Sequence, residues 1–446
     1  MDRYDSYKDS GVEWIDKIPS EWEISRLRFT GDLYGGLSGK SGDDFKQDNN
    51  PNNKPYIPYT NIFNNTYISK EHFDYVVIDE GENQNLVRKF DLFFLMSSET
   101  HEDLGKPCIL IEDVDELYLN SFCKGLRVTD SSINPVFLNY QLLGQVHKEL
   151  ISVEGRGFTR INLRQDRLKD TPIFIPPLHQ QNQIVSFLDT KTSLIDSLIE
   201  KTQRKIELIK EQRTSLINEV VTKGLNPNVE MKDSGVEWIG EIPSHWVTTK
   251  LGLYTTKVGS GSTPRGGSEI YVETGIPFIR SQNVHFDGLK LDNVSFIEND
   301  VHDSMKGSVV VKNDVLLNIT GGSIGRCCVV NIDGEMNVNQ HVSIIRTKEK
   351  LLNYFLNYII SCDVGQSQVK YNLTGGNREG LTIEGIKDFQ ISLPPLSEQK
   401  EIVEYLDNEI QLIDTTVSNE EKRIELLKEY RQSLISEVVT GKIKVS

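Results

Sequence analysis

Apolar residues recur at spacings of three, four and seven in two long stretches of the chain, one after Pro177 and one after Pro395. They lie at Val185, Leu188, Ile195, Ile199, Ile206, Ile209, Leu216 and Val220, and again at Val403, Leu406, Ile413, Val417, Ile424, Leu427, Leu434 and Val438. This pattern predicts two helices of about five heptads each. A stripe this narrow leaves a lone helix unstable in water, so we expect the two helices to pair as an antiparallel coiled coil. The alternative is that each helix packs only on its own neighbouring domain.

The segments that frame these helices also occur twice. The sequence Lys8-Asp-Ser-Gly-Val-Glu-Trp-Ile returns from Lys232, at an offset of 224 residues. The tripeptide Pro-Pro-Leu opens each helix, once from Pro176 and again from Pro394, at an offset of 218 residues. The inserts between these frames share far fewer positions. Two matching frames around two divergent inserts predict one scaffold that carries two different readers.

Each insert combines short apolar runs with turn signals, which predicts a compact domain of short strands. The inserts share landmarks at Ile57-Pro58-Tyr59 and Ile276-Pro277-Phe278, at residues 89–94 and 312–317, and at residues 104–106 and 324–326. The predicted fold class is therefore α+β, with two mixed α/β domains joined by the two long helices. The expected boundaries are 1–175 for the first domain, 176–225 for the first helix, 226–393 for the second domain and 394–446 for the second helix.

The formal net charge of −16 argues against nucleic acid as a partner, because phosphate contacts require Lys and Arg. Net charge, however, does not describe how charge is distributed. Residues 247–393 hold 14 basic and 15 acidic side chains, whereas residues 23–175 hold 17 basic and 23 acidic ones. The second insert could present a basic face, and the first must concentrate its positive charge if it binds DNA.

The chain lacks an apolar run of roughly the 18 residues that a membrane span needs. Its N-terminus is polar and acidic, unlike a secretory signal. We therefore expect a cytoplasmic protein without membrane contact. The five cysteines contain no C-x-x-C spacing, which predicts buried thiols rather than a disulfide framework.

Several segments come close to catalytic motifs. Residues 35–41 resemble a phosphate-binding loop, but Tyr34 stands where the motif requires Gly, and no clear apolar strand leads into the loop. Asn134-Pro135 is interpreted as the cap and first residue of a helix rather than as part of an amino-methyltransferase loop. His341 aligns with Phe122, so we expect it to be packed rather than catalytic. The sequence predicts no catalytic residue and no metal ligand, and an enzyme that uses the loop at 35–41 is the minor alternative.

Four loops combine Gly, short hydroxyl side chains and Arg, at residues 155–160, 259–265, 320–326 and 372–378. Such loops offer backbone N–H groups and Arg side chains for phosphate contact and base-edge reading. The candidate DNA-binding residues are Lys40, Lys106, Arg156, Arg160, Arg164, Arg265, Arg280, Arg326, Thr374, Asn377 and Arg378.

All four tryptophans lie in the duplicated frames, at Trp14, Trp22, Trp238 and Trp246. An apolar lid that docks each insert on the helices is the first interpretation, and partner binding is the second.

The frame residues closely resemble those of a known family, the specificity subunits of type I restriction-modification enzymes. The resemblance rests on Asp233-Ser-Gly-Val-Glu-Trp-Ile-Gly-Glu-Ile-Pro-Ser-His-Trp246 and on Pro394-Pro-Leu-Ser-Glu-Gln399, and it covers essentially the whole chain. The first helix departs from the Glu-Gln pair at one position, where it carries Gln180-Gln181.

The resemblance implies that each insert is a target recognition domain that reads one half of a split sequence in double-stranded DNA. It implies that the helices set the spacing and dock methyltransferase subunits. S-adenosylmethionine, ATP and Mg²⁺ would belong to the methyltransferase and restriction/translocase partners, with no cofactor on this non-catalytic chain. The competing hypothesis is a structural coiled-coil scaffold that binds protein partners without reading DNA.

Overall fold

The computed structural model describes residues 3–12, 15–45, 49–264, 266–374 and 380–445. The chain divides into two compact units. Unit 1 comprises Met1–Gln203 and Lys422–Ser446, and unit 2 comprises Arg204–Glu421. This division cuts both long helices, so each unit contains one insert and a segment of each helix. Within the described ranges, no helix has the length and apolar character to cross a membrane.

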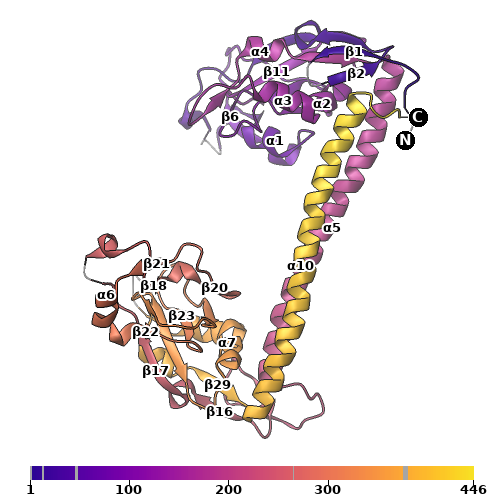
Figure 1. Cartoon of the computed structure of the whole chain (residues 1–446). Coiled ribbons are helices and arrows are strands. Elements are labelled where there is room, and N and C mark those ends of the chain that lie inside the picture. The colour runs from indigo at the N-terminus through magenta and orange to yellow at the C-terminus, as the bar shows by residue number, and fades with distance from the viewer. Residues whose placement is uncertain (1–2, 13–14, 46–48, 265, 375–379, 446) are drawn as a thin grey trace. The chain divides into compact units, whose positions relative to one another are not determined.

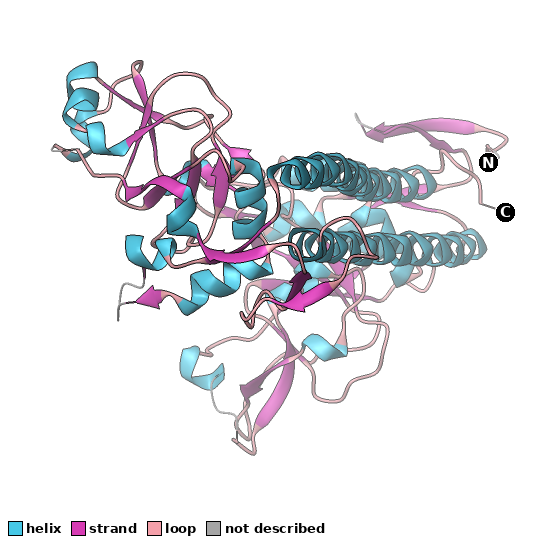
Figure 2. Cartoon of the chain, turned by 90° about the horizontal axis from the view of Figure 1, so that it is seen from below, coloured by secondary structure: helices cyan, strands magenta, loops and turns pink. Residues whose placement is uncertain are grey.

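The two predicted helices are α5 (Leu178–Lys223) and α10 (Leu396–Val439). At about 1.5 Å per residue, each is roughly 65–70 Å long. Every apolar residue of the two predicted seven-residue ladders is buried or half-buried. In each unit the two helical segments lie side by side (Figure 1; Figure 2), which confirms the predicted pairing.

Ion pairs between the helices give their direction. In unit 1, Arg431 Nε lies 2.9 Å from Asp196 Oδ1. In unit 2, Arg213 Nε lies 3.4 Å from Asp414 Oδ1. On α5, the residue of the second pair comes later in the sequence than that of the first, whereas on α10 it comes earlier. The two helices therefore run antiparallel.

Unit 1 consists of short strands and helices in addition to its helical segments. Its strands are β1 (Tyr7–Val12), β2 (Ile15–Pro19), β3 (Glu23–Arg26), β4 (Gly31–Gly35), β5 (Asn53–Ile57), β6 (Asp74–Val77), β7 (Leu92–Leu95), β8 (Ser97–Ser98), β9 (Pro107–Ile109), β10 (Tyr118–Leu119), β11 (Cys123–Val128), β12 (Ile161–Asn162) and β13 (Pro172–Ile175). Its short helices are α1 (Tyr59–Asn64), α2 (Pro135–Leu143), α3 (Gln145–Ser152) and α4 (Gln165–Lys169). The main sheet is antiparallel in the order β4-β11-β7-β9, and a second sheet has the order β10-β5-β6.

Unit 2 repeats this arrangement. Its strands are β14 (Met231–Asp233), β15 (Glu241–Pro243), β16 (Val247–Lys250), β17 (Thr255–Ser260), β18 (Ile276–Ile279), β19 (Val284–His285), β20 (Gly288–Leu289), β21 (Ser295–Ile297), β22 (Val309–Val310), β23 (Val315–Asn318), β24 (Cys327–Val329), β25 (Met336–Val338), β26 (Val342–Thr347), β27 (Leu373–Thr374), β28 (Gly380–Leu381) and β29 (Gln390–Leu393). Its short helices are α6 (Asn299–Ser304), α7 (Asn353–Ser361), α8 (Asp363–Tyr371) and α9 (Ile383–Lys387). The main sheet has the order β17-β26-β23-β24 and corresponds strand by strand to that of unit 1.

A buried carboxylate directly before a central strand of each main sheet carries the same pair of bonds. Asp91 accepts from Nε and Nη2 of Arg127 at 3.0 and 2.7 Å, and Asp314 accepts from the same atoms of Arg346 at 2.7 and 2.8 Å. The turn before each carboxylate contains a non-glycine residue with positive φ, Phe90 or Asn313. The predicted likeness of residues 89–94 and 312–317 is therefore confirmed in detail.

One predicted landmark is out of register by three residues. Tyr56 pairs with Tyr118 on the parallel neighbour of β5, and Phe278 pairs with Asn337 on the parallel neighbour of β18. Tyr56, rather than Tyr59, is thus the counterpart of Phe278. The tripeptides at 57–59 and 276–278 resemble each other only in sequence, because strand pairing is what determines the register.

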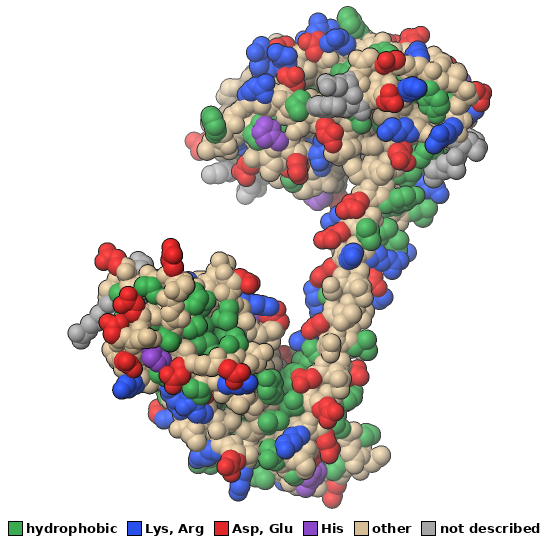
Figure 3. Space-filling view, viewed as in Figure 1, with side chains coloured by type: hydrophobic (Ala, Val, Ile, Leu, Met, Phe, Trp, Pro, Cys, Tyr) green, Lys and Arg blue, Asp and Glu red, His purple; other side chains and the backbone are tan. Residues whose placement is uncertain are grey.

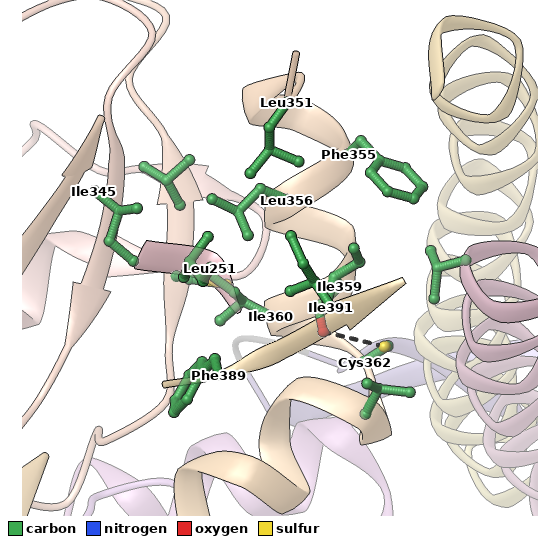
Figure 4. Packing of buried hydrophobic residues seen from close by; sticks show 14 of the residues in the cluster. Leu251, Ile345, Leu351, Phe355, Leu356, Ile359, Ile360, Cys362, Phe389 and Ile391 are labelled. Atoms are coloured by element: carbon green, nitrogen blue, oxygen red, sulfur yellow. Dashed lines mark hydrogen bonds between the residues drawn. The ribbon is translucent and has the colours of Figure 1, made fainter. Parts of the chain in front are cut away.

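The core of unit 2 joins its sheet to its helices. Figure 4 shows Phe355, Leu356 and Ile359 of α7 in the same cluster as Ile345 of β26 and Ile391 of β29. All five cysteines of the chain are buried and unpaired, as predicted. Burial raises the pKa of the Cys108 and Cys123 thiols to about 12, so these thiols are inert packing residues.

The core of unit 1 is built from both ends of the described chain, which lie together in Figure 1. Ile18 of β2 and Trp22, just before β3, share one apolar cluster with Ile435 and Val438 of α10. The Tyr7 hydroxyl donates a hydrogen bond to the Gly441 carbonyl at 3.2 Å. Unit 1 is therefore incomplete without residues from 422 onward.

Candidate nucleic-acid interface

Three loops that are distant in sequence meet at one edge of unit 2. The Thr263 hydroxyl donates to Gln340 Oε1, and Gln340 Nε2 lies 3.1 Å from His341 Nε2. On the other side of the ring, His341 Nδ1 is hydrogen-bonded to the Thr320 hydroxyl. Hydroxyl, amide and imidazole groups can donate to or accept from the edges of bases. This cluster is therefore a candidate reading surface.

The same edge of unit 1 has a different chemistry. Phe122 occupies the turn before β11, and its side chain is 55% exposed. The Arg160 guanidinium lies 5.2 Å from the centroid of the Phe122 ring. Pairing of Ile161 with Ser98 holds the loop that contains Arg160 beside the loop that follows β8. An aromatic face and a cation thus replace the polar cluster of unit 2.

The backbone under these two surfaces is the same. The Asn120 side chain accepts from the Phe122 N–H at 2.9 Å, and the Asn339 side chain accepts from the His341 N–H at 3.2 Å. A Cβ added at Gly261 would overlap the backbone of the strand that leads into the turn, and a Cβ at the equivalent Gly36 would do the same. Identical turns therefore present different side chains.

Three of the predicted DNA-binding cations already have partners. Lys40 lies 2.5 Å from Glu82, and its side chain is only 4% exposed. Lys106 donates to the Phe63 carbonyl, and burial lowers its pKa. Arg164 makes two bonds to its neighbour Asp166, at 3.0 and 2.9 Å. None of the three is poised for a phosphate without first releasing these contacts.

Lys106 also lines a cleft of about 1180 Å³ within unit 1, between the insert and the helical segments. The cleft carries both charges, from Lys148 and Arg431 and from Asp103 and Asp196. Such a mixed lining does not favour a polyanion.

The other described candidates are less constrained. Arg156 Nη1 donates to the Val153 and Gly155 carbonyls at 2.9 and 2.8 Å, which holds it at the base of its own loop. Arg280 lies 5.8 Å from the Tyr271 ring centroid, and its buried Nε has no hydrogen-bond partner within the described ranges. Arg326 is half-buried at the end of the loop that contains Thr320.

Five predicted residues cannot be placed in the site. Trp14, Arg265, Asn377 and Arg378 lie outside the described residues, and the Thr374 side chain is likewise outside the description.

The loop that resembles a phosphate-binding motif follows β4, a strand of sequence Gly-Asp-Leu-Tyr-Gly without a buried residue, in agreement with the expectation that no apolar strand leads into it. It leads into a single 3-10 turn (Gly42–Phe45) rather than into an α-helix. A nucleotide loop uses the N–H groups at the start of a helix, so the local structure does not favour a nucleotide site.

The site residues that sequence reasoning did not name are Gln340, Phe122 and Thr263, although Thr263 lies in the loop at 259–265 that it selected. His341, which was expected to be packed rather than catalytic, is half-buried and hydrogen-bonded at both ring nitrogens. The sequence signal that could have revealed these residues is the pair of aligned turns, in which Asn120 matches Asn339 but Phe122 differs from His341. Sequence reasoning used that difference only to reject catalysis.

Trp22 and Trp246 are both 0% exposed and belong to the apolar clusters that join insert and helices. The Trp22 indole donates to Gln180 at 3.1 Å, and the Trp246 indole donates to Glu398 at 3.0 Å. These positions confirm the lid interpretation and leave neither ring surface for a partner. Gln180 accepts the same bond as Glu398, so the departure at this position preserves the contact.

Trp238 is half-buried against Tyr371, at 5.4 Å between ring centroids, and Tyr371 is 75% exposed. Partner binding at Trp238 stays a prediction.

The long helices expose apolar side chains away from their seam. Leu194 is 62% exposed in unit 1, and Leu412, at the same position of the other helix, is 63% exposed in unit 2. Leu208 and Leu426 form a second such pair, at 48% and 54%. Exposed apolar residues at matching positions indicate a contact surface that occurs twice.

On the face shown in Figure 3, basic and acidic side chains are interspersed over both units. The surface charge on this face therefore does not single out a binding area, and the side chains of the two turns are the better guide.

Comparison with known proteins identifies a family. The model described as "Type I restriction modification DNA specificity domain" matches residues 19–208 and 243–428. The type I restriction enzyme MjaVIII specificity subunit of Methanocaldococcus jannaschii is 24% identical over 436 residues, which cover 96% of this chain and 94% of that protein.

Two solved structures share the fold at 17% sequence identity. A structure described as "Structural basis underlying complex assembly and conformational transition of the type I R-M system" matches with a TM-score of 0.75, over 96% of this chain and 99% of that chain. The HsdS subunit from Thermoanaerobacter tengcongensis matches with a TM-score of 0.55, over 97% and 100% of the two chains. These matches agree with the predicted α+β fold with two long helices.

Proposed function

The chain belongs to the family of type I restriction modification DNA specificity domains, as a specificity subunit, and we propose that each of its units reads one half of a split DNA sequence. Unit 1 reads through the turn that carries Phe122, with Arg160 beside it. Unit 2 reads through the cluster of Thr263, Gln340 and His341. The two long helices determine the separation of the half-sites.

The observation that carries this proposal is the pair of equivalent turns. Both have the same Asn contact and the same close backbone approach at a glycine, yet Phe122 in one corresponds to His341 in the other. A scaffold without a reading function has no reason to keep the turn and vary its tip. Two readers of different half-sites require that combination.

The test is to sequence methylated adenines in cells that express this chain with its partner subunits. Phe122→Ala should relax or abolish one half of the methylated motif, and His341→Ala should affect the other half. A base contact is worth about 1–3 kcal/mol of discrimination, so preference at one or two positions should fall by roughly 5- to 150-fold. Phe29→Ala is the matched control, since Phe29 is 68% exposed on the same unit but outside the turn.

Loss of both halves together in each variant would contradict separate readers. A complex that assembles and never selects a sequence would instead support the scaffold hypothesis.

We also propose that methyltransferase subunits dock on the exposed leucines of the long helices. Leu194 and Leu412 offer equivalent contacts, so each should hold one copy of the partner. Leu194→Glu should remove one copy, and the double variant should remove both, as measured by the mass of the purified complex. Lys201→Glu places the same charge on an exposed position of the same helix and should leave the assembly intact. Full assembly of the double variant would refute this docking surface.

Catalysis belongs to the partners in this proposal. S-adenosylmethionine, ATP and Mg²⁺ would bind to the methyltransferase and restriction/translocase subunits, and this chain would supply sequence selection alone. The purified chain should therefore bind none of the three in equilibrium dialysis.

A further inference from the structure

Phe158 is the most exposed large apolar side chain among the described residues, with a relative exposure of 106%. It stands in the loop at residues 155–160, beside the candidate reading surface of unit 1. The ring is therefore fully available to a partner, and its surroundings indicate which partner it fits.

The loop that carries Phe158 has a defined shape. Backbone bonds in both directions join Arg156 and Asn162, at 3.1 and 2.9 Å, and close the loop at its base. Gly157 has a φ of +137°, and a Cβ there would overlap the Arg160 carbonyl. A tight turn that only glycine permits therefore projects the ring at its tip.

The charges around the ring indicate what it contacts. Residues 155–160 include two arginines and no carboxylate. Arg160 lies over the Phe122 ring, so its guanidinium is held at the edge of the same surface. An apolar tip between two cations fits DNA, because the phosphates are anionic and the stacked bases between them have flat apolar faces.

We propose that Phe158 is an apolar wedge that inserts between adjacent base pairs of the half-site read by unit 1. This inference rests on the proposed function. Arg160 contacts a flanking phosphate, Arg156 adds positive charge at the base of the loop, and the ring replaces part of the stacking that the opened step loses. The aligned position of unit 2 carries Gly376 in the sequence, so only unit 1 has the wedge.

The experiment uses the chain assembled with its methyltransferase subunits and a duplex that contains its methylated sequence. The fluorescent base 2-aminopurine is placed in turn at each step of both half-sites, since its emission rises when it loses a stacked neighbour. The methyltransferase subunits extrude the adenines that they methylate, so the steps next to these adenines are left out. We expect a rise at one remaining step of the unit 1 half-site and none at the remaining steps of the other half-site. Phe158→Ala should abolish that rise and weaken binding roughly tenfold, whereas Phe158→Trp should retain both.

Phe29→Ala controls for the loss of an exposed phenyl ring elsewhere on unit 1, and should change neither signal. A rise that persists in Phe158→Ala would overturn the wedge while leaving the proposed readers intact. Weaker assembly of Phe158→Ala with the methyltransferase subunits in the absence of DNA would also overturn it, because the ring would then contact protein. Failure of the wild-type complex to select any sequence would refute the proposed function itself.

Discussion

Removal of the Asp314 carboxylate should open the main sheet of unit 2 and leave that of unit 1 closed. Asp314 is 0% exposed and accepts two bonds from Arg346. It also accepts the Val311 N–H at 2.9 Å, which holds the turn before β23. Asp314→Ala therefore leaves three donors without an acceptor and one guanidinium without its counter-charge.

The size of the effect follows from burial. Removal of one partner of a buried ion pair costs about 3–5 kcal/mol, because the other charge stays behind without compensation. The Arg346 side chain is 37% exposed, so water can solvate part of its charge and the lower limit applies. About 3 kcal/mol corresponds to a factor of roughly 100 in the local opening equilibrium. Asp314→Asn keeps the volume and one acceptor, and should cost less.

Hydrogen–deuterium exchange of the full chain, read by mass spectrometry, measures this opening. Peptides that cover β23 and β26 should lose protection by roughly 100-fold in Asp314→Ala. Peptides that cover β7 and β11 should stay unchanged, and Asp91→Ala should show the reverse pattern. Unaltered exchange of β23, or equal loss in both sheets, would refute the argument that each ion pair holds its own sheet.

Two further changes test other contacts. Burial lowers the pKa of His147 from 6.5 to about 4, so the unfolded chain takes up a proton below pH 6.5 that the folded chain does not. Unit 1 should therefore lose stability as the pH falls below 6.5, by about 2 kcal/mol at pH 5, and urea titrations should show that His147→Gln removes this loss. Gly261→Ala should destabilise unit 2 by roughly 3 kcal/mol in the same assay, because the added Cβ overlaps the Val338 carbonyl. Gly259→Ala, which meets nothing within 4 Å, is its control, and an equal effect of the two would show that the close approach is unimportant.

The features that could be predicted from sequence are those that short-range pattern determines. The seven-residue ladders gave both long helices, and the matched residues at 89–94 and 312–317 gave two copies of one turn and strand. The Asn134 cap is also local, and its side chain accepts from Val136 and Phe137 as predicted. Each of these depends on residues within a turn or a heptad of one another.

The features that could not be predicted depend on contacts between distant segments. The register of Tyr56 is set by β10, about 60 residues away in the sequence, and a nearby Ile-Pro-aromatic tripeptide gave the wrong match. The cluster around His341 joins three loops, and no single one of them looks like a site. Lys40 looked available for phosphate because its partner Glu82 is 42 residues further along the chain.

The discontinuous core of unit 1 has a consequence for biosynthesis. A ribosome releases the chain in order, so the contiguous residues 204–421 emerge completely while unit 1 still lacks its second segment. Until residues 422–445 follow, Ile18 and Trp22 have no Ile435 or Val438 to pack against. The unit that begins first in the gene therefore matures last. A premature stop codon just after residue 421 would leave unit 2 whole and damage unit 1, whose first segment is encoded upstream of it.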